Sequence, residues 1–175
     1  MTQWAIGCIL ALLPVLALAA PPLGQPLPEV TLADKDGGRV TGEAWSSSEL
    51  SGKVHVMFYV DPDERDINDH VTEALKAEGF PRDKYGSVAA INMAATGLPN
   101  FLINRSLKSK QKEFPDTVYV KDLRKVLVQA WDVDDDNNDV LVFAPDGALV
   151  FYRAGKLSDE DVQELIATIR EYLPD

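Results

Sequence analysis

Two runs of hydrophobic residues predict the central strands of a sheet. Residues 54–60, with the sequence VHVMFYV, are rich in β-branched and aromatic side chains and nearly unbroken in hydrophobicity. Such a run is typical of a strand that is covered on both faces. Residues 87–92, with the sequence SVAAIN, predict a second buried strand.

Two helices are predicted from an apolar stripe and a capping residue. Asp66 is placed to cap a helix whose apolar residues run from Ile67 to Leu75 at helical spacing. Near the C-terminus, Ser158 and Asp161 form a capping-box pattern ahead of a second apolar stripe. This last helix has the clearest start signal in the chain.

A further helix is predicted between Pro99 and Pro115. We expect Phe101, Leu102 and Phe114 to face the protein interior. The basic residues of this segment are expected to face largely outward: Arg105, Lys108, Lys110 and Lys112.

The remaining hydrophobic segments predict short strands. Residues 117–120 and 126–131 are two of them, and residues 140–143 and 148–152 flank a turn at residues 144–147. The resulting order of strands and helices is that of a mixed α/β protein. Its first crossover implies parallel neighbours, and the C-terminal β-hairpin adds antiparallel ones.

The N-terminus has the pattern of a secretory signal. Residues 6–20 are apolar, and Ala17-Leu18-Ala19 offers the small-x-small sequence that signal peptidase accepts. An uncleaved anchor and a buried core helix are the alternatives, but about 15 apolar residues are fewer than a bilayer span needs. We therefore expect residues 1–19 to be removed, the chain to be periplasmic, and no stable membrane insertion after cleavage.

Cleavage would leave a single domain without cysteine. Removing the first 19 of the 175 residues leaves 156, residues 20–175, and also removes Cys8, which is the only cysteine. The formal net charge is −11, so nucleic acid and anionic lipid are poor candidate partners. A cation or a basic patch on another periplasmic protein fits this charge better, although acidity alone can also serve solubility.

Two groups of residues resemble a known fold. Near the N-terminus they are Gly24, Pro26, Pro28, Asp36-Gly37 and Gly52-Lys53; later they are Val120, Asp122, Ala130-Trp131, Pro145-Asp146-Gly147 and Gly155. This pattern resembles thioredoxin-like and peroxiredoxin-like domains, and most closely the YtfJ-like family of periplasmic proteins. The resemblance implies a thioredoxin-like three-layer sandwich with a mixed central sheet, flanking helices and a C-terminal β-hairpin plus helix.

The resemblance also implies where redox chemistry would occur. In that fold a nucleophilic cysteine follows the first central strand and begins the next helix, where the helix N-terminus lowers its pKa. Here that position holds a degenerate redox-site loop: Asp61, Pro62, Asp63, Glu64 and Arg65. The stretch 137–139, where thioredoxins commonly carry a cis-proline, contains no proline. Thiol-disulfide exchange is therefore excluded.

An acidic run at residues 132–139 is the one candidate metal site. Asp132, Asp134, Asp136 and Asp139 place oxygen ligands as hard cations require, which suggests weak Ca²⁺ binding as the only candidate cofactor. The run lacks the glycine and glutamate of an EF-hand, so a solvated loop is the alternative reading. Two histidines without a cysteine cannot build the usual zinc site; we expect His55 to be packed and His70 to lie at the solvent boundary.

The thioredoxin-like fold would bring both acidic loops to one end of the sheet. Asp61, Asp63 and Glu64 would then face Asp134, Asp136 and Asp139, and mutual repulsion would favour a cation or a basic partner. We therefore expect a non-catalytic binding or adaptor module. The alternative is a carboxylate- or divalent-metal-dependent enzyme, or a weak calcium-binding protein, that uses the same acidic end.

Overall fold

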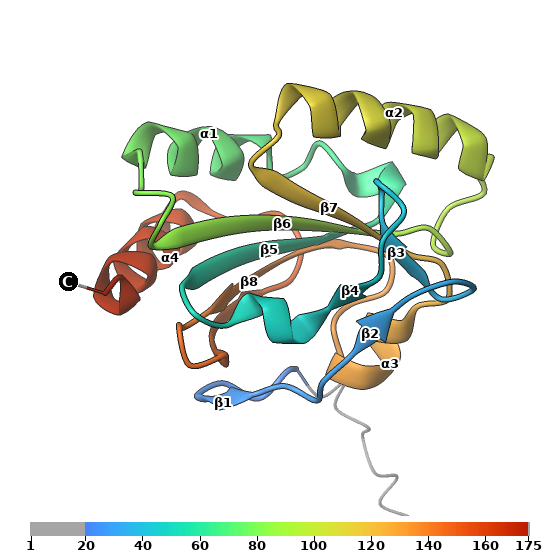
Figure 1. The fold of residues 1–175 in the computed structure, drawn as a ribbon. Helices are drawn as coiled ribbons and strands as arrows, with labels where there is room; N and C mark the ends of the chain where they lie inside the picture. Colours follow the sequence, from blue (N-terminus) through green and yellow to red (C-terminus); the bar gives the residue numbers. More distant parts are fainter. Residues whose placement is uncertain (1–19, 175) are drawn as a thin grey trace, which may run out of the picture.

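The computed structural model describes residues 20–174, so the predicted signal peptide lies outside the described residues (Figure 1). The strands are β1 (Gln25–Pro26), β2 (Thr31–Leu32), β3 (Gly37–Arg39), β4 (Trp45–Ser46), β5 (Val54–Val60), β6 (Tyr85–Asn92), β7 (Thr117–Asp122), β8 (Asn138–Phe143) and β9 (Ala148–Arg153). The helices are α1 (Asp69–Glu78), α2 (Asn100–Glu113), α3 (Val126–Trp131) and α4 (Asp159–Tyr172), with short 3-10 helices η1 (Ser47–Leu50) and η2 (Pro62–Glu64).

The expected mixed central sheet is confirmed. Seven strands form it in the order β1-β9-β8-β5-β6-β7-β3, and β2 pairs with β4 in a separate small sheet. β5, β6 and β7 are parallel, whereas β8 is antiparallel to β5 and to β9, its partner in the C-terminal hairpin. The three parallel strands all run toward the right-hand side of Figure 1, so their carboxyl ends share one edge.

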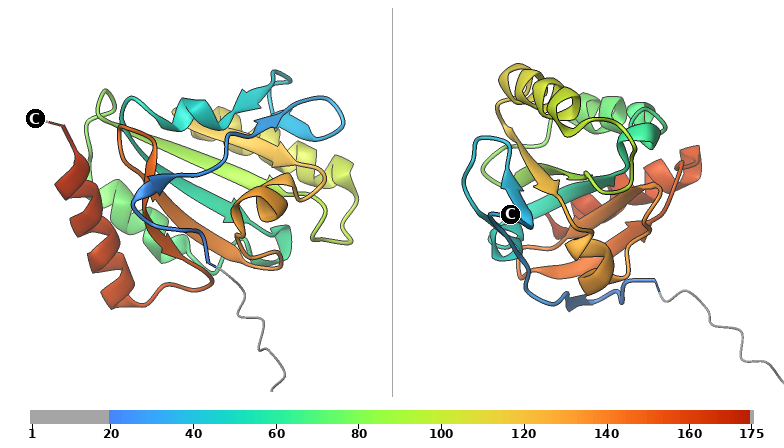
Figure 2. Two further views of the ribbon diagram at one scale, coloured as in Figure 1. Left: turned by 90° about the horizontal axis from the view of Figure 1, so that it is seen from below. Right: turned by 90° about the vertical axis from the view of Figure 1, so that its right-hand side faces the viewer.

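The central strand β5 shows why the sheet is covered on both faces. Its residues are all buried, and alternate side chains point to opposite sides. Val56 and Phe58 belong to a core cluster shared with α1, α2 and α4, whereas Met57 and Tyr59 belong to a second cluster shared with α3, β2 and β4. The helices therefore form two layers around the sheet, as Figure 2 shows.

The segment 126–131 is a helix, so the predicted strand is wrong. Buried Asp122, at the end of β7, accepts hydrogen bonds from the backbone N–H groups of Val126 and Leu127, both at 2.9 Å. Lys125 adopts a left-handed conformation with φ 58° that turns the chain into this helix. The carboxylate thus satisfies the free N–H groups of the first helical turn, which overrides the strand preference of Val126, Leu127 and Val128.

The first long helix begins later than the sequence indicates. Asp66 was the expected cap, but α1 starts at Asp69 with Asn68 before it. Residues 62–64 form η2 instead, capped by the Asp61 carboxylate, which accepts a hydrogen bond from the Asp63 N–H at 2.9 Å. Gly79 ends α1 in a left-handed conformation with φ 62°, which glycine adopts without steric cost.

The facing of α2 also corrects a prediction. Ile103 and Leu107 are its buried residues, whereas Phe101, Leu102 and Phe114, expected inside, are exposed. The Gln111 side chain hydrogen-bonds the backbone of the next strand, donating to Thr117 O at 3.0 Å and accepting from Tyr119 N at 3.4 Å. These hydrogen bonds to β7 fix the rotation of α2 about its own axis, and so decide which side chains face the sheet. The hydrophobicity of the segment alone does not predict that rotation.

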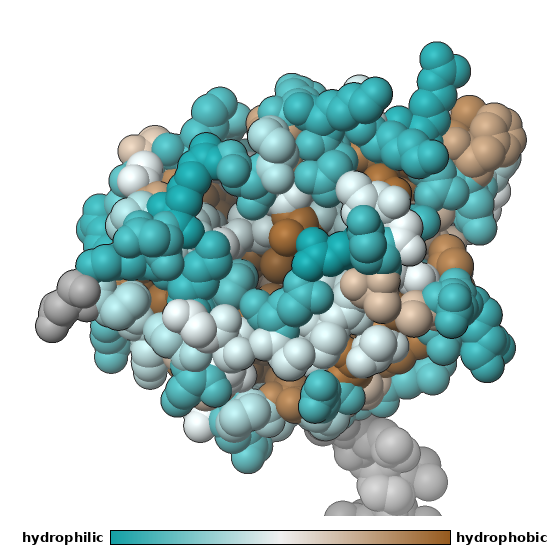
Figure 3. All heavy atoms as spheres, viewed as in Figure 1, coloured by the Kyte–Doolittle hydropathy of each residue, from teal (hydrophilic) through white to brown (hydrophobic). Residues whose placement is uncertain are grey.

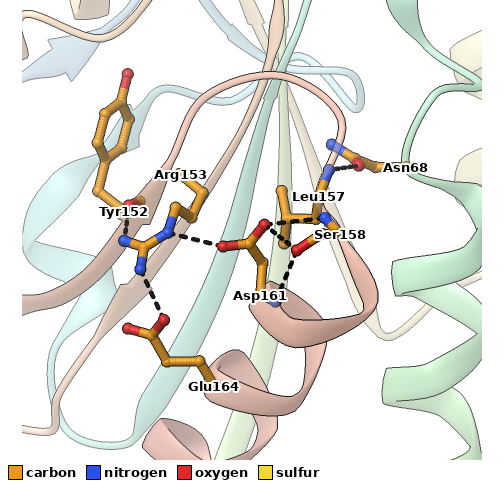
Figure 4. A network of polar contacts seen from close by, with 7 residues as sticks. All are labelled: Asn68, Tyr152, Arg153, Leu157, Ser158, Asp161 and Glu164. Carbon is orange, nitrogen blue, oxygen red and sulfur yellow. Dashed lines mark hydrogen bonds and ion pairs between the residues drawn. The ribbon is translucent and has the colours of Figure 1, made fainter.

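The C-terminal hairpin and helix match the sequence closely. β8 and β9 pair around the turn at residues 144–147, and Ala144 N–H donates to Ala148 O at 2.9 Å. In α4 the Ser158 hydroxyl accepts from the Asp161 N–H, and the Asp161 carboxylate accepts from the Ser158 N–H (Figure 4). This predicted capping box is therefore confirmed.

Candidate functional site

The carboxyl end of β5 is where the two predicted acidic loops meet. We call this surface the acidic end; it comprises residues 61–65 and 132–139. The Asp61 N–H donates to the Asn137 carbonyl at 2.7 Å, and the Asn138 side chain donates to the Glu64 carbonyl at 3.2 Å. The expected juxtaposition of the loops is confirmed, and it lies at the edge of the parallel strands where α/β folds commonly bind ligands.

Asp61, at the position implied for a redox cysteine, is a buried carboxylate. Only 4% of its surface is exposed. Burial raises the pKa of Asp61 above its usual range, and the negative charges of Asp63, Asp136 and Asp135 raise it further. The hydrogen bond from the Asp63 N–H acts in the opposite direction. Beyond the effect of burial, the pKa of Asp61 is therefore raised by the negative charges that the sequence predicts at this end.

Asn68 ties the acidic end to the rest of the fold. Its buried side-chain amide donates to the Asn138 carbonyl at 3.1 Å and to the Gly155 carbonyl at 2.9 Å. Its side-chain oxygen accepts from the Leu157 N–H at 3.0 Å (Figure 4). One side chain therefore joins the start of α1, the start of β8 and the loop before α4, so Asn68 fixes the relative position of three segments.

Asp139 is turned away from solvent. Its carboxylate accepts hydrogen bonds from the Asp134 N–H at 2.7 Å and from the Tyr152 hydroxyl at 3.2 Å. The other carboxylate oxygen has no hydrogen-bond partner among residues 20–174. Burial raises the pKa of Asp139 to about 7, and the nearby Asp134 charge adds to the effect. The buried carboxylate of Asp139 therefore fixes the backbone of the acidic loop at Asp134.

Lys125 supplies a positive charge within the acidic end. Its ammonium pairs with the Asp135 carboxylate at 2.6 Å, and this contact raises the pKa of Lys125. The buried Asn92 amide donates to the other Asp135 carboxylate oxygen and to the Asp135 carbonyl, both at 2.9 Å. The fold thus neutralises one carboxylate of the loop with its own lysine, a compensation that the sequence did not reveal.

Most of the remaining acidic groups face outward. Asp63, Asp132 and Asp136 are exposed, and Glu64 and Asp134 are partly exposed. A shallow hollow of about 320 Å³ has carboxylates in its wall, among them Asp132, Asp134 and Asp135. The acidic end therefore presents a concentration of negative charge to solvent.

The chemistry open to this site is limited by its side chains. No cysteine occurs in residues 20–174. In the same part of the chain, no three His, Cys, Asp or Glu side chains are grouped so that they could hold a metal ion. Weak calcium binding by Asp132, Asp134, Asp136 and Asp139 stays a prediction. Of these four, Asp139 is buried and already engaged by Asp134 and Tyr152.

Both histidines contact backbone carbonyls that lie outside the acidic loops. His55 is buried, with Nδ1 3.0 Å from the Leu50 carbonyl oxygen, and burial lowers its pKa. His70 is exposed on α1, with Nε2 3.0 Å from the Leu157 carbonyl oxygen. These positions agree with the packed and solvent-boundary placements expected from sequence.

Comparison with known protein families finds one family that matches most of the chain. The family described as "Bacterial protein of unknown function (YtfJ_HI0045)" matches residues 23–172. The chain belongs to this family. The match spans nearly all of the residues that the structure describes, including both loops of the acidic end.

Two family relatives and one solved structure extend this finding. The chain is 28% identical to "Uncharacterized protein YtfJ" of Escherichia coli strain K12, over 97% of this chain and 96% of the relative. It is 30% identical to an uncharacterized protein of Haemophilus influenzae, over 81% and 77% of the two chains. The exposed lipoprotein thioredoxin Etrx1 of Streptococcus pneumoniae superposes with a TM-score of 0.61 at 13% identity, covering 82% and 99%. The fold is therefore thioredoxin-like.

Sequence reasoning located the two loops but missed the side chains that organise them. Asn68 and Asn92 carry no motif, because their partners lie far away in the sequence. Lys125 lies between the two segments that the sequence predicts as strands, and the sequence gives it no role. The tight turn before α3 depends on its positive φ, which lysine rarely adopts, so no residue preference signalled it.

The lengths of the helices can be compared with the length that a membrane span needs. Among residues 20–174 the longest helices, α2 and α4, have 14 residues each, and no helix combines the length and apolar composition of a membrane span.

Proposed function

We propose that the protein is a non-catalytic binding or adaptor module of the periplasm, which docks a basic protein partner at the acidic end. The observation that carries this proposal is the hydrogen-bonded meeting of two acidic loops at the carboxyl edge of the sheet. Burial and the surrounding negative charge together raise the pKa of Asp61, as expected where carboxylates crowd. A basic side chain placed against these loops would relieve their repulsion.

The non-catalytic part of the proposal rests on the residues at the redox position. Asp61 caps η2 with its side chain, so its carboxylate is engaged in building the loop. Carboxylates can neither attack a disulfide nor reduce a peroxide, which a thiolate does. The thioredoxin-like scaffold is complete around this loop, and its surface remains available for recognition.

The periplasmic part rests on the signal pattern at residues 1–19, which lie outside the described residues. Cell fractionation followed by N-terminal sequencing tests it. We expect periplasmic protein that begins at or near Ala20; a full-length cytoplasmic product would contradict the export proposal while leaving the fold unaffected.

Calcium binding is a second candidate function at the same surface. It is favoured by the repulsion that acts on Asp61 from Asp63, Asp135 and Asp136. A hard cation coordinated by carboxylate oxygens would relieve the same repulsion as a basic partner. We expect this binding to be weak, because no glycine or glutamate frames the loop as in an EF-hand.

The partner proposal is tested by affinity capture with matched variants. The immobilised mature chain is exposed to periplasmic extract, and bound proteins are eluted with a salt gradient. Asp63→Asn/Glu64→Gln removes one exposed and one partly exposed charge from the acidic end. Glu160→Gln/Glu171→Gln removes two exposed charges from α4 and serves as the control.

We expect a basic protein that is retained by the wild type and the control and lost by Asp63→Asn/Glu64→Gln. Calorimetry with that protein, once purified, should give the same order of affinities and a marked decrease with salt. Equal retention by all three chains, or no retained protein, would contradict docking at the acidic end.

A further inference from the structure

Helix α2 carries an unusual share of the exposed apolar side chains. Among residues 20–174, four of the six large hydrophobic residues that are exposed lie on α2 or beside it: Leu98 (42%), Phe101 (69%), Leu102 (47%) and Phe114 (40%). Three of these gather at its N-terminal end, where Figure 3 shows hydrophobic surface at the upper right. Its sheet-facing side is supplied by Ile103 and Leu107 alone.

The same helix carries a row of cations. Phe101, Arg105, Lys108 and Lys112 follow at helical spacing and line a shallow hollow of about 510 Å³ on the outward side. Arg105, Lys108, Lys110 and Lys112 form no ion pair with any carboxylate in residues 20–174. Each of the other arginines forms an ion pair: Arg39, Arg65, Arg82, Arg124, Arg153 and Arg170. Of the lysines outside α2 in the same part of the chain, Lys76 and Lys125 are paired and the other five are not.

We propose that the outward face of α2 docks the protein on an anionic phospholipid surface. The cations would attract the phosphate headgroups, while Phe101, with Leu98 and Leu102 beside it, would enter the boundary between headgroups and acyl chains. This pairing of basic and exposed apolar side chains on one helix is typical of peripheral membrane binding. The docking is peripheral, because α2 has only 14 residues.

The net charge of −11 does not oppose this contact as strongly as the sequence suggests. At physiological ionic strength, charges more than about 8 Å from the surface are largely screened. In Figures 1 and 2, α2 forms an outer edge of the molecule, with the sheet between it and α3. The general expectation that anionic lipid is a poor partner is therefore revised for this one helix.

A lipid surface fits these features better than an acidic protein does. Long basic side chains without fixed ion-pair partners can follow headgroups that move, whereas a protein interface would select fixed, directional pairs. Among residues 20–174, Phe101 is also the most exposed large hydrophobic residue, and it lies at one end of the cationic row, as an inserting side chain would. Acidic residues on the neighbouring α1 oppose the attraction, which makes the binding sensitive to salt.

Vesicle flotation of the mature chain tests the proposal. Vesicles with about 30% phosphatidylglycerol are compared with pure phosphatidylcholine at about 50 mM and about 150 mM salt. Arg105→Gln/Lys108→Gln removes two cations from α2, and Lys35→Gln/Lys156→Gln removes two exposed lysines elsewhere as the control. Each basic residue near an anionic surface contributes about fivefold, so partitioning should weaken about 30-fold in the first variant and little in the control.

A fluorescent variant separates insertion from adsorption. Trp45 and Trp131 are buried, so Phe101→Trp adds the only exposed tryptophan in the mature chain. Its emission should shift to shorter wavelength with anionic vesicles and not with neutral ones. Absence of binding to anionic vesicles at low salt, or equal binding of both glutamine variants, would overturn the proposal. In another outcome, the wild type fails to bind vesicles but captures an acidic soluble protein that Arg105→Gln/Lys108→Gln does not capture. That result would assign α2 to a protein partner and overturn the lipid proposal.

Discussion

At the scale of single residues, the buried carboxylates decide how this fold is held and how it responds to pH. Asp122 is satisfied by its neighbours, since it accepts from Tyr59, Arg124, Val126 and Leu127. By contrast, only one of the two carboxylate oxygens of Asp139 accepts hydrogen bonds within residues 20–174. The sequence places Asp139 in the acidic run and Asp122 among the residues that resemble the thioredoxin-like pattern. It does not predict that either is buried, because burial depends on which distant donors surround each carboxylate.

Replacing Asp139 by Asn should remove a pH dependence of stability. Burial raises the pKa of Asp139 to about 7. The folded chain therefore holds a proton there that the unfolded chain releases near pH 4. The stability from this proton is present below about pH 4 and is lost as pH rises to about 7, at up to about 1.4 kcal/mol per pH unit.

Urea unfolding of the wild type and Asp139→Asn between about pH 4 and pH 8 measures this effect. The free energy of unfolding of the variant, relative to that of the wild type, should increase with pH up to about pH 7 and then become constant. Asp83→Asn, on an exposed turn, is the control and should show no such trend. A difference that stays constant across the range would contradict the raised pKa.

Replacing Asp122 by Asn should destabilise the fold by about 3 kcal/mol, because one oxygen that accepts backbone N–H groups becomes a donor facing donors. The free energy of unfolding at neutral pH measures the loss, with Asp83→Asn again as the control. A loss no greater than that of the control would show that α3 does not depend on this carboxylate.

At the scale of elements, local signals predicted those helices and strands whose determinants lie within one segment. The α4 capping box and the β8–β9 turn have all their partners within a few residues, so the sequence was sufficient. α3 was missed because Asp122 acts on it from β7. The facing of α2 was missed because the partners of its Gln111 side chain lie in β7. The meeting of the two acidic loops was implied by the resemblance to the thioredoxin-like fold, in which these loops lie at one end of the sheet.

The loop at residues 132–139 should be destabilised by its own charge. Asp134→Asn/Asp136→Asn should raise the metal-free melting temperature slightly, because it removes the negative charge of Asp136, which acts on Asp61, and that of Asp134, which acts on Asp139. If calcium binds there, a concentration tenfold above its dissociation constant should stabilise the wild type by about 1.4 kcal/mol, and the variant much less.

Thermal unfolding in CaCl₂ is compared with NaCl of matched ionic strength, because screening alone relieves part of the repulsion. A shift specific to CaCl₂ and confined to the wild type supports a calcium site. The same shift in both salts, or in both chains, would leave the loop as a solvated acidic surface.

At the scale of the whole molecule, a thioredoxin-like sheet is complete while the loop at its redox position contains carboxylates. Chain order and hydrophobic pattern predicted a mixed α/β protein, and the resemblance to thioredoxin-like domains implied the three-layer architecture. They did not predict the outward face of α2, because its exposure follows from how that helix packs. The protein is therefore best understood as a scaffold with a strongly acidic end and a separate basic helix.

The mature chain should be inactive in thiol chemistry. Residues 20–175 contain no cysteine, so insulin reduction and peroxide reduction should not exceed a buffer blank. Thiol titration of the same preparation should give no signal. Turnover that persists after further purification, and that a redox-active contaminant does not explain, would contradict the non-redox account.

Photo-crosslinking in living cells tests the central claim most directly. A photoreactive amino acid replaces Asp63 at the acidic end or, as a control, Glu160 on α4; both positions are exposed. The account predicts a discrete crosslinked product from position 63 that contains a basic periplasmic protein, weakened by Asp134→Asn/Asp136→Asn and absent from position 160. No product from position 63, or the same products from both positions, would contradict the assignment of the acidic end as the docking surface.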